Sequence, residues 1–433
     1  MKGVSQIKDR MNAKLTSKER LINTLNRRPV DHVPLLLRFW PLSGDVDEIP
    51  FDWRDQVRRV ENTLALGLDD TLLLQPPLGY VEEYIPERVP GVVSRTGLIP
   101  AEDDRYPLLK KVYETPTGPL QTVVRITEDW PHGEEIRLFD DHNISRLKEP
   151  LIKNREDLPG LEHLLGNPGE GQLQTFREQA ARLREQAQRL GVALEGGWSA
   201  LGDAAVWVCG MERILYGQTD EPEFLEQLLD VILEWELQRM DQVLSEGVDV
   251  WVHMAWYEGS DFWSPRYYRR LLKPRLAKMV ARAHAHGVPF RYIITKGWTP
   301  IREDILELGI DCLTGLDPVQ DRVNLQEVKQ LLGGRLCLMG GVNSGVMLTQ
   351  WGEEQIRQAV TQALEILAPG GGFILYPVDA VFNTQPWDKV QALIDQWKTC
   401  QNLKEVDGKD NYPVGFDQNS YGISNLNKFE KEE

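Results

Sequence analysis

The chain has 433 residues, of which 41% are hydrophobic and 27% are charged, enough to bury a large core in one big α/β domain or two smaller ones. Its formal net charge of -17 argues against a nucleic-acid or anionic-membrane partner, since both bind clustered Lys and Arg. Four scattered cysteines without a Cys-x-x-Cys pair, a polar N-terminus and the lack of a long apolar run predict a cytoplasmic protein with reduced thiols.

The segment from residue 16 to residue 34 predicts the first helix. Thr16 and Glu19 have the spacing of a capping box, and apolar residues follow at helical intervals. Pro29 then ends the helical pattern, because proline cannot continue a helix beyond its first turn.

Eight short apolar runs follow along the chain, most of them without alternation, as expected for strands of a parallel sheet covered on both faces. They span residues 33–39, 70–76, 192–198, 248–256, 289–296, 311–317, 336–342 and 373–379. Amphipathic helical segments separate most of these runs. We therefore predict an α/β fold with a single (β/α)8 TIM-type barrel, and an open doubly wound sheet is the alternative.

One long segment interrupts this repeat after the second predicted strand. Residues 78–165 contain two β-rich runs on either side of the sequence TPTG at 115–118, which predicts a β-hairpin. Long loops after barrel strands usually lie over the active-site mouth, so we expect a lid or an oligomer contact. We assign residues 1–402 to the barrel with its insertion, and we interpret the polar, aperiodic residues 403–433 as a disordered tail.

Polar side chains occur at the carboxyl end of every predicted strand, which is where the active site of a TIM barrel lies. The candidate catalytic groups are Asp379, Glu195, Lys296 and His253. The candidate substrate-binding groups are Arg38, Gln75, Trp256, Tyr257, Glu258, Asp317, Asn343 and Tyr376.

Several of these residues also have a structural interpretation. Glu195 and Asp379 suit an ion pair as well as catalysis. His253 lies inside its strand, where a core histidine is expected, and Asp317 precedes a proline and could start a turn.

At the level of longer segments, the chain resembles the uroporphyrinogen decarboxylase superfamily, which also contains the methyl-corrinoid and methyl-coenzyme M methyltransferases. The resemblance covers roughly residues 15–400 and is carried by TSKERLINTLNRRPVDHVP, GMERILYGQTDEPEFLEQLLD, SPRYYRRLLKPRLAKMVARAHAHGVPF, LELGIDCLTGLDP, LCLMGGVNSG and GGGFILYPVDAVFNTQPWDKVQALIDQWK. It implies a TIM barrel and a homodimer. The insertion with TPTGPL looks more like the methyltransferase-type members than the decarboxylase itself.

The zinc-binding methyltransferases of this superfamily carry a His-x-Cys-Gly at the tip of strand five and a further Cys after strand eight. The matching positions here are Ile294, Lys296 and Asp379. Isoleucine has no ligating atom and an ammonium group repels a cation, so we predict no metal at these positions. We also predict no organic cofactor.

The decarboxylase pattern matches at one arginine. Arg38 fills the first arginine of the loop after strand one, and Leu42 replaces the second. The aspartate expected after strand two has no counterpart, since Gln75 is followed by two prolines, and Asp379 stands where a late histidine is expected.

Three functions remain open from the sequence. The first is a decarboxylase-type lyase that acts on a carboxylated small molecule, with Arg38 and Lys296 binding carboxylates. The second is a methyltransferase without zinc that moves a methyl group from an O- or N-methyl donor to a corrinoid protein, which would then be its partner. The third is a ligand-binding barrel without catalysis. We expect a small-molecule ligand in each case.

Overall fold

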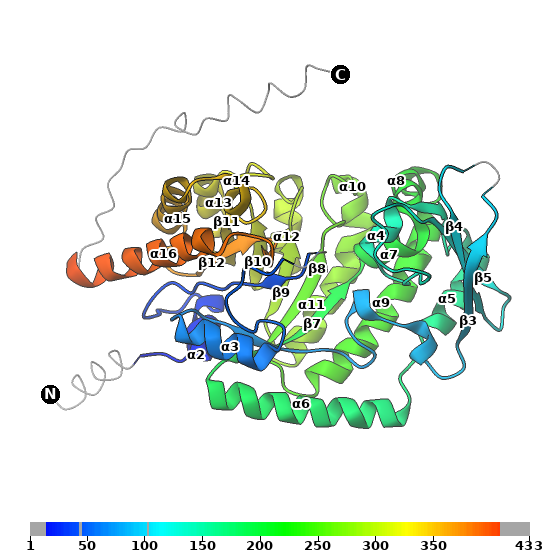
Figure 1. The fold of residues 1–433 in the computed structure, drawn as a ribbon, viewed down its shortest axis with the longest axis horizontal. Helices are drawn as coiled ribbons and strands as arrows, with labels where there is room; N and C mark the ends of the chain where they lie inside the picture. Colours follow the sequence, from blue (N-terminus) through cyan, green and yellow to red (C-terminus); the bar gives the residue numbers. More distant parts are fainter. Residues whose placement is uncertain (1–13, 43–45, 102–103, 408–433) are drawn as a thin grey trace, which may run out of the picture.

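The computed structural model describes residues 14–42, 46–101 and 104–407. A curled parallel sheet of seven strands forms the centre of this α/β protein (Figure 1). In spatial order the strands are β12 (Phe373–Val378), β11 (Cys337–Asn343), β10 (Cys312–Leu316), β9 (Phe290–Ile294), β8 (Val250–Ala255), β7 (Ala193–Ala200) and β2 (Thr71–Leu74). Consecutive strands are neighbours and the order never reverses, so there is no switch point of the doubly wound kind. The sheet is consistent with a TIM-like barrel.

The first predicted strand forms only isolated bridges and a two-residue strand. Leu35 bridges Leu375 of β12, and Leu36 bridges Asp69 just before β2, both in parallel. This segment therefore bridges edge strand β12 and the chain just before edge strand β2. The following residues form β1 (Phe39–Trp40), which pairs in parallel with β13 (Val381–Phe382).

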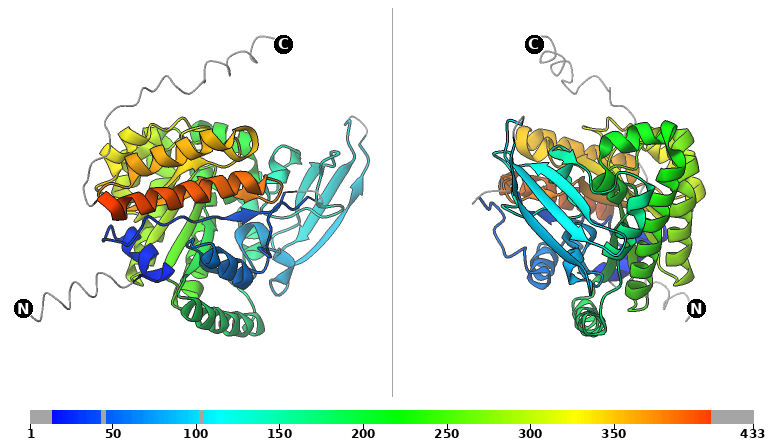
Figure 2. Two further views of the ribbon diagram at one scale, coloured as in Figure 1. Left: turned by 60° about the vertical axis from the view of Figure 1, so that its left-hand side comes forward. Right: turned by 90° about the vertical axis from the view of Figure 1, so that its right-hand side faces the viewer.

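Helices surround the sheet, and their ends follow local rules of the sequence (Figure 2). The longer ones are α2 (Ser17–Leu25), α3 (Gln56–Ala65), α6 (Glu170–Leu190), α7 (Gly202–Cys209), α8 (Met211–Asp220), α9 (Pro222–Leu244), α11 (Lys273–Ala285), α13 (Leu325–Leu332), α15 (Glu353–Leu367) and α16 (Trp387–Asp407). The predicted capping box is confirmed, because Thr16 caps α2 and Glu19 returns the bond. Among the described residues, no helix is long and apolar enough to cross a membrane.

The C-terminal segment is helical further than expected. Residues 403–407 belong to α16, and the rest of the predicted tail lies outside the described residues.

The insertion forms an antiparallel sheet at one end of the molecule (Figure 1). Its strands are β3 (Val93–Ile99), β4 (Leu108–Glu114), β5 (Leu120–Arg125) and β6 (Leu147–Glu149). The predicted hairpin is confirmed as the pair β4 and β5, with Gly118 N–H donating to Thr115 O at 3.1 Å in the turn. Between β5 and β6 the chain passes through the short helix α4 (Asp141–Ile144), which packs against α7.

Candidate functional site

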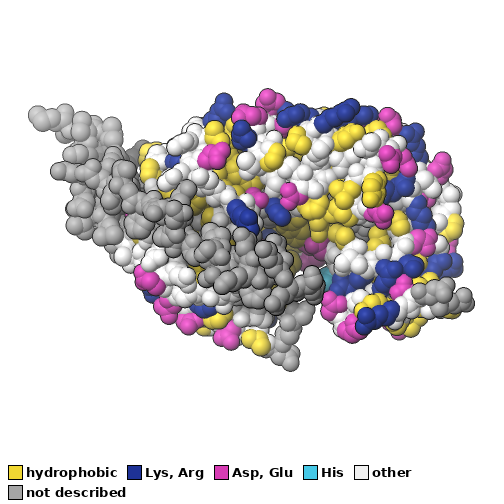
Figure 3. Space-filling model, turned by 90° about the horizontal axis from the view of Figure 1, so that it is seen from above, with side chains coloured by type: hydrophobic (Ala, Val, Ile, Leu, Met, Phe, Trp, Pro, Cys, Tyr) yellow, Lys and Arg dark blue, Asp and Glu magenta, His cyan; other side chains and the backbone are white. Residues whose placement is uncertain are grey.

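A cavity of about 710 Å³ lies at the carboxyl ends of the parallel strands. Seen from above, this face is hollowed, with hydrophobic side chains on the wall of the hollow and charged side chains and a histidine at its rim (Figure 3). Both the strand ends and the insertion contribute to the lining. The sequence-predicted residues in the lining are Arg38, Glu195, Trp256, Lys296, Asp317, Tyr376 and Asp379.

Arg38 directs an unpaired guanidinium group into this cavity. Its guanidinium carbon lies 3.7 Å from the ring centroid of Trp198 and 4.8 Å from that of Trp40. Within the part of the chain that the structure describes, this group has no ion-pair partner within 4.0 Å. Burial lowers the pKa of Arg38, and Arg291 acts in the same direction. A planar cation held by stacking, with free donors, is suited to bind a carboxylate.

Asp379 faces the same cavity from the loop after β12. It has a φ of 82°, which costs a non-glycine residue free energy and is common at functional sites. The Tyr376 hydroxyl donates to the Asp379 carbonyl oxygen at 2.7 Å and so holds this conformation. Burial raises the pKa of Asp379; Arg38 opposes this shift and Asp317 adds to it.

Glu195 and Arg291 form a buried ion pair on the floor of the cavity. Arg291 donates to both carboxylate oxygens, at 2.6 and 3.2 Å, and each side chain is less than a tenth exposed. A carboxylate occupied by a two-pronged partner is a poor proton acceptor. The arrangement therefore favours the structural interpretation of Glu195.

Lys296 and Asp317 lie at the rim and at the wall of the cavity, respectively. Lys296 is exposed and its ammonium group lies 3.3 Å from Asp261. Asp317 is buried and accepts hydrogen bonds from the backbone N–H groups of Val319 and Gln320, so it does start a turn. Burial raises the pKa of the neighbouring Asp321 to about 6.

Five predicted site residues lie outside the cavity lining: Gln75, His253, Tyr257, Glu258 and Asn343. His253 is fully buried, with its ring nitrogens 2.8 Å from Ser199 Oγ and 3.1 Å from Glu258 Oε1. The Tyr292 hydroxyl donates to the other oxygen of Glu258 at 2.7 Å. This network joins β7, β8 and β9 below the cavity, which is a structural arrangement.

The other three outlying residues are engaged by near neighbours. The Gln75 amide donates to Glu83, and the Tyr257 hydroxyl donates to Asp141 at 3.0 Å. Asn343 is buried and donates to Asp317 at 2.7 Å, so it supports the cavity wall from behind.

Several residues in the lining were not predicted from the sequence, chiefly Arg291 and Glu82. Arg291 is the charged residue in an otherwise apolar or aromatic strand, and that contrast could have identified it. Glu82 gives no such signal, because it lies in the insertion. Burial raises the pKa of Glu82 to about 7; Arg38 lowers it, and Asp141 and Asp140 raise it further.

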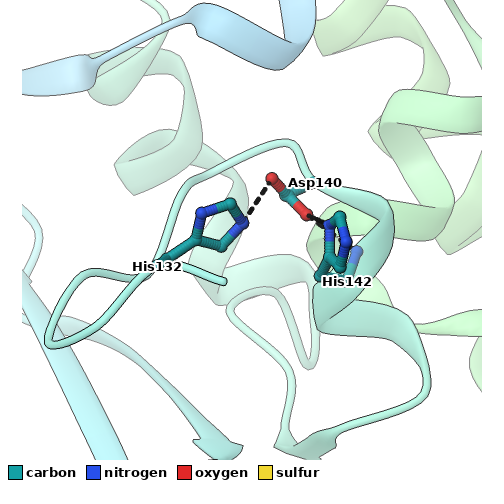
Figure 4. Close-up of side chains that lie close together, drawn as sticks. All are labelled: His132, Asp140 and His142. Atoms are coloured by element: carbon teal, nitrogen blue, oxygen red, sulfur yellow. Dashed lines mark hydrogen bonds and ion pairs between the residues drawn. The ribbon is translucent and has the colours of Figure 1, made fainter. Parts of the chain in front are cut away.

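The insertion also brings His132, Asp140 and His142 together at the cavity wall (Figure 4). Asp140 lies between the two imidazole rings, 2.9 Å from His132 Nε2 and 2.9 Å from His142 Nδ1. Burial lowers the pKa of His132, while Asp140 raises it.

The three positions that the resemblance matches to zinc ligands of methyltransferases carry side chains of different character in the structure. Ile294 is a fully buried apolar residue of β9, and Lys296 pairs with Asp261. Of the three positions, only Asp379 carries a ligating oxygen.

Comparisons with known proteins agree on the family and the fold. The family model for uroporphyrinogen decarboxylase (URO-D) matches residues 129–400, more than half of the chain. A methyltransferase from Methanosarcina mazei has a similar structure, with a TM-score of 0.55 and 18% sequence identity, over 89% of this chain and 99% of that chain. At this identity the similarity shows the fold alone.

Other comparisons add little. A 3-keto-D-glucoside 4-epimerase from E. coli matches 52% of this chain and 85% of its own, at 13% identity and a TM-score of 0.32, which is too low to carry an argument. No curated protein matches the sequence.

Proposed function

Because the chain belongs to the uroporphyrinogen decarboxylase (URO-D) family, we propose that it is an enzyme that decarboxylates a carboxylated small molecule in the cavity at the strand ends. The observation that carries this proposal is the guanidinium of Arg38, which stacks on Trp198 and has no ion-pair partner among the described residues. A partly buried cation without an anionic partner is costly, unless a ligand supplies the partner.

The floor of the cavity provides a comparison for Arg38. Arg291 is ion-paired with Glu195, so its charge is compensated within the protein. Arg38 is left as the cation for a substrate carboxylate, and Lys296, exposed at the rim and 3.3 Å from Asp261, adds a second positive charge. A substrate with two or more carboxylates would use both.

Decarboxylation breaks the bond between a substrate carbon and its carboxylate carbon. The electron pair stays on the substrate carbon, carbon dioxide leaves, and a proton takes its place. Asp379 is our candidate for the proton transfer, because burial raises its pKa and it faces the cavity beside Arg38. We propose that the step needs no organic cofactor, provided that the substrate itself can delocalise the electron pair.

The test is carbon dioxide release. Purified protein is incubated with a panel of ¹³C-labelled carboxylated molecules, including reduced porphyrin precursors and aromatic polycarboxylates, and labelled carbon dioxide is measured by mass spectrometry. We expect release from at least one substrate, and a large loss of kcat/KM in both Arg38→Ala and Lys296→Ala. Turnover that is unchanged in both variants would overturn the assignment of these cations.

Methyl transfer to a corrinoid protein is the second candidate, and the aromatic part of the cavity favours it. Trp40, Trp198 and Trp256 line the cavity, and such faces bind methylated cations. This candidate predicts that a corrinoid protein binds the chain and becomes methylated by an O- or N-methyl donor. Binding and methylation together, without carbon dioxide release, would replace the first candidate.

A further inference from the structure

A cluster of two histidines and one aspartate lies in the insertion, apart from the strand-end residues of the proposed reaction. The one ligand atom that each of His132, Asp140 and His142 offers lies within 4.8 Å of the other two. The two rings stand nearly perpendicular, at 85°, with centroids 5.3 Å apart, and the carboxylate lies between them (Figure 4).

Local structure holds the aspartate and one histidine in this arrangement. Asp140 is the N-cap of α4, and its Oδ1 accepts the backbone N–H of His142 at 2.7 Å. The Trp130 ring packs edge-on against His132, with centroids 5.1 Å apart. Contacts between residues near in sequence therefore place the three possible metal ligands close together.

The imidazole of His132 lies mostly buried beside the Asp140 carboxylate. Its side chain is 10% exposed, and that of Asp140 is 7% exposed. His132 Nε2 lies 2.9 Å from Asp140 Oδ2, at ion-pair distance, but among the described residues this nitrogen makes no well-aligned hydrogen bond. A cation bound by both groups would give this nitrogen an electron-pair acceptor.

We propose that His132, Asp140 and His142 bind a divalent transition-metal cation, with Zn²⁺ as the best match. Two imidazoles and one carboxylate are a common ligand set for zinc, which leaves a fourth position open. His142 is 48% exposed and all three residues line the cavity, so the open position faces the cavity or its mouth.

The charges around the cluster favour a cation. Glu82 and Asp141 are additional acidic residues of the same cavity wall, and both interact electrostatically with Asp140. The Arg137 guanidinium is the opposing charge, 3.9 Å from Asp140 Oδ2. Ligands at about 2.0–2.2 Å from zinc lie about 3.3–3.6 Å from one another in a tetrahedron. Each imidazole nitrogen would therefore move away from the Asp140 oxygen that it contacts at 2.9 Å, and the widest separation in the cluster, at most 4.8 Å, would shrink.

The alternative is an ion-pair network that ties the insertion together without a metal. A metal-binding measurement distinguishes the metal site from the ion-pair network, because the network alone predicts no stoichiometric metal binding. The measurement is also independent of the decarboxylation proposal, since it does not use turnover. A failure of one leaves the other standing.

The experiment is metal binding to the chelator-treated full-length protein. Zn²⁺ is added in equilibrium dialysis and measured by elemental mass spectrometry, and Co²⁺ is added to a second sample to record its visible ligand-field spectrum. We expect one equivalent of Zn²⁺ and a Co²⁺ spectrum of a four- or five-coordinate site with nitrogen and oxygen ligands.

The variants are His132→Ala, His142→Ala and Asp140→Asn, with His286→Ala as the matched control on the exposed end of α11. Asp140→Asn keeps an N-cap acceptor, so α4 and the fold are retained. Each ligand variant should weaken zinc binding by more than the 10–100-fold typical of losing an outer hydrogen-bond partner, and the control should bind as the wild type. No zinc in the wild type, or full affinity in Asp140→Asn, would overturn the proposal.

Discussion

Replacing Arg38 by methionine, and Arg291 by methionine in a second variant, separates a ligand-binding role from a structural role. Both arginines line the same cavity, but they differ in whether an acidic side chain pairs with them. In the described part of the chain, Arg38 stacks on Trp198 without an ion-pair partner, whereas Arg291 is paired with Glu195. Methionine keeps much of the length of the side chain and removes the charge in both variants. The matched pair of substitutions therefore isolates the effect of pairing.

The structure predicts the size of each change. Arg38→Met loses a cation–π contact worth about 0.5–2 kcal/mol and relieves the burial of an uncompensated cation, which offsets that loss. We expect the free energy of unfolding to change by less than about 1 kcal/mol. Arg291→Met leaves Glu195 buried without its partner, which costs about 3–5 kcal/mol.

Ligand binding should respond in the opposite order. Loss of the Arg38 contact to a substrate carboxylate should cost about 2–5 kcal/mol, a roughly 30-fold to several-thousand-fold weaker affinity. The assay is urea denaturation followed by circular dichroism, together with thermal-shift titrations against the carboxylate panel. If Arg38→Met loses 3 kcal/mol of stability or more, Arg38 is a structural residue and the argument for the carboxylate site fails.

Three further predictions concern the fold. Burial lowers the pKa of His32 to about 4, below the unfolded value of about 6.5. The neutral, buried imidazole therefore stabilises the folded state above pH 6.5. This contribution to the free energy of unfolding, at most about 3 kcal/mol, is lost as the pH falls towards 4. Imidazole NMR titration and urea unfolding at both pH values check this, and His32 titrating above 6 would contradict it. Glu258→Ala should lower the free energy of unfolding by about 3 kcal/mol, since it breaks a fully buried hydrogen-bond network; a thermal melt unchanged from the wild type would refute that role. Gly315→Ala should lower the free energy of unfolding by at least about 2 kcal/mol, because φ is 114° and the new Cβ would lie 2.1 Å from Ile294 O. Gly334 has open space around it, so Gly334→Ala should change the free energy of unfolding by less than about 0.5 kcal/mol. Equal effects of the two glycine substitutions in a thermal-shift assay would contradict the steric argument.

Local signals in the sequence predicted the elements of this protein well. The capping box at Thr16 and the hairpin turn at residues 115–118 involve contacts between residues near in sequence, so residue type and spacing suffice. Seven of the eight apolar runs became strands of the parallel sheet, because a strand buried on both faces must be apolar throughout. The eighth, at residues 33–39, formed one bridge to β12 and one to the residue before β2, but little regular ladder.

Which charged side chains of the cavity wall are available to a ligand depends on the ion pairs that the fold creates. A polar residue at a strand end is visible in the sequence, but whether its charge is free or neutralised is set by its neighbour across the sheet. Glu195 and Arg291 lie 96 positions apart in the chain and neutralise each other, while Arg38 has no ion-pair partner within residues 14–42, 46–101 and 104–407. His253 was a candidate catalytic residue whose place inside the strand also suited a core histidine, and it is part of a buried network.

The parallel α/β architecture, the place of the insertion and the family could be predicted from residue order, because they depend on the hydrophobic pattern and on motifs spread along the chain. The fold was needed to see which charges in the described part of the chain face the cavity without a partner, and that the insertion returns His132, Asp140 and His142 to the cavity wall. The free energy of a buried charge depends on the groups that surround it in space. Those neighbours come from segments that the linear pattern does not connect.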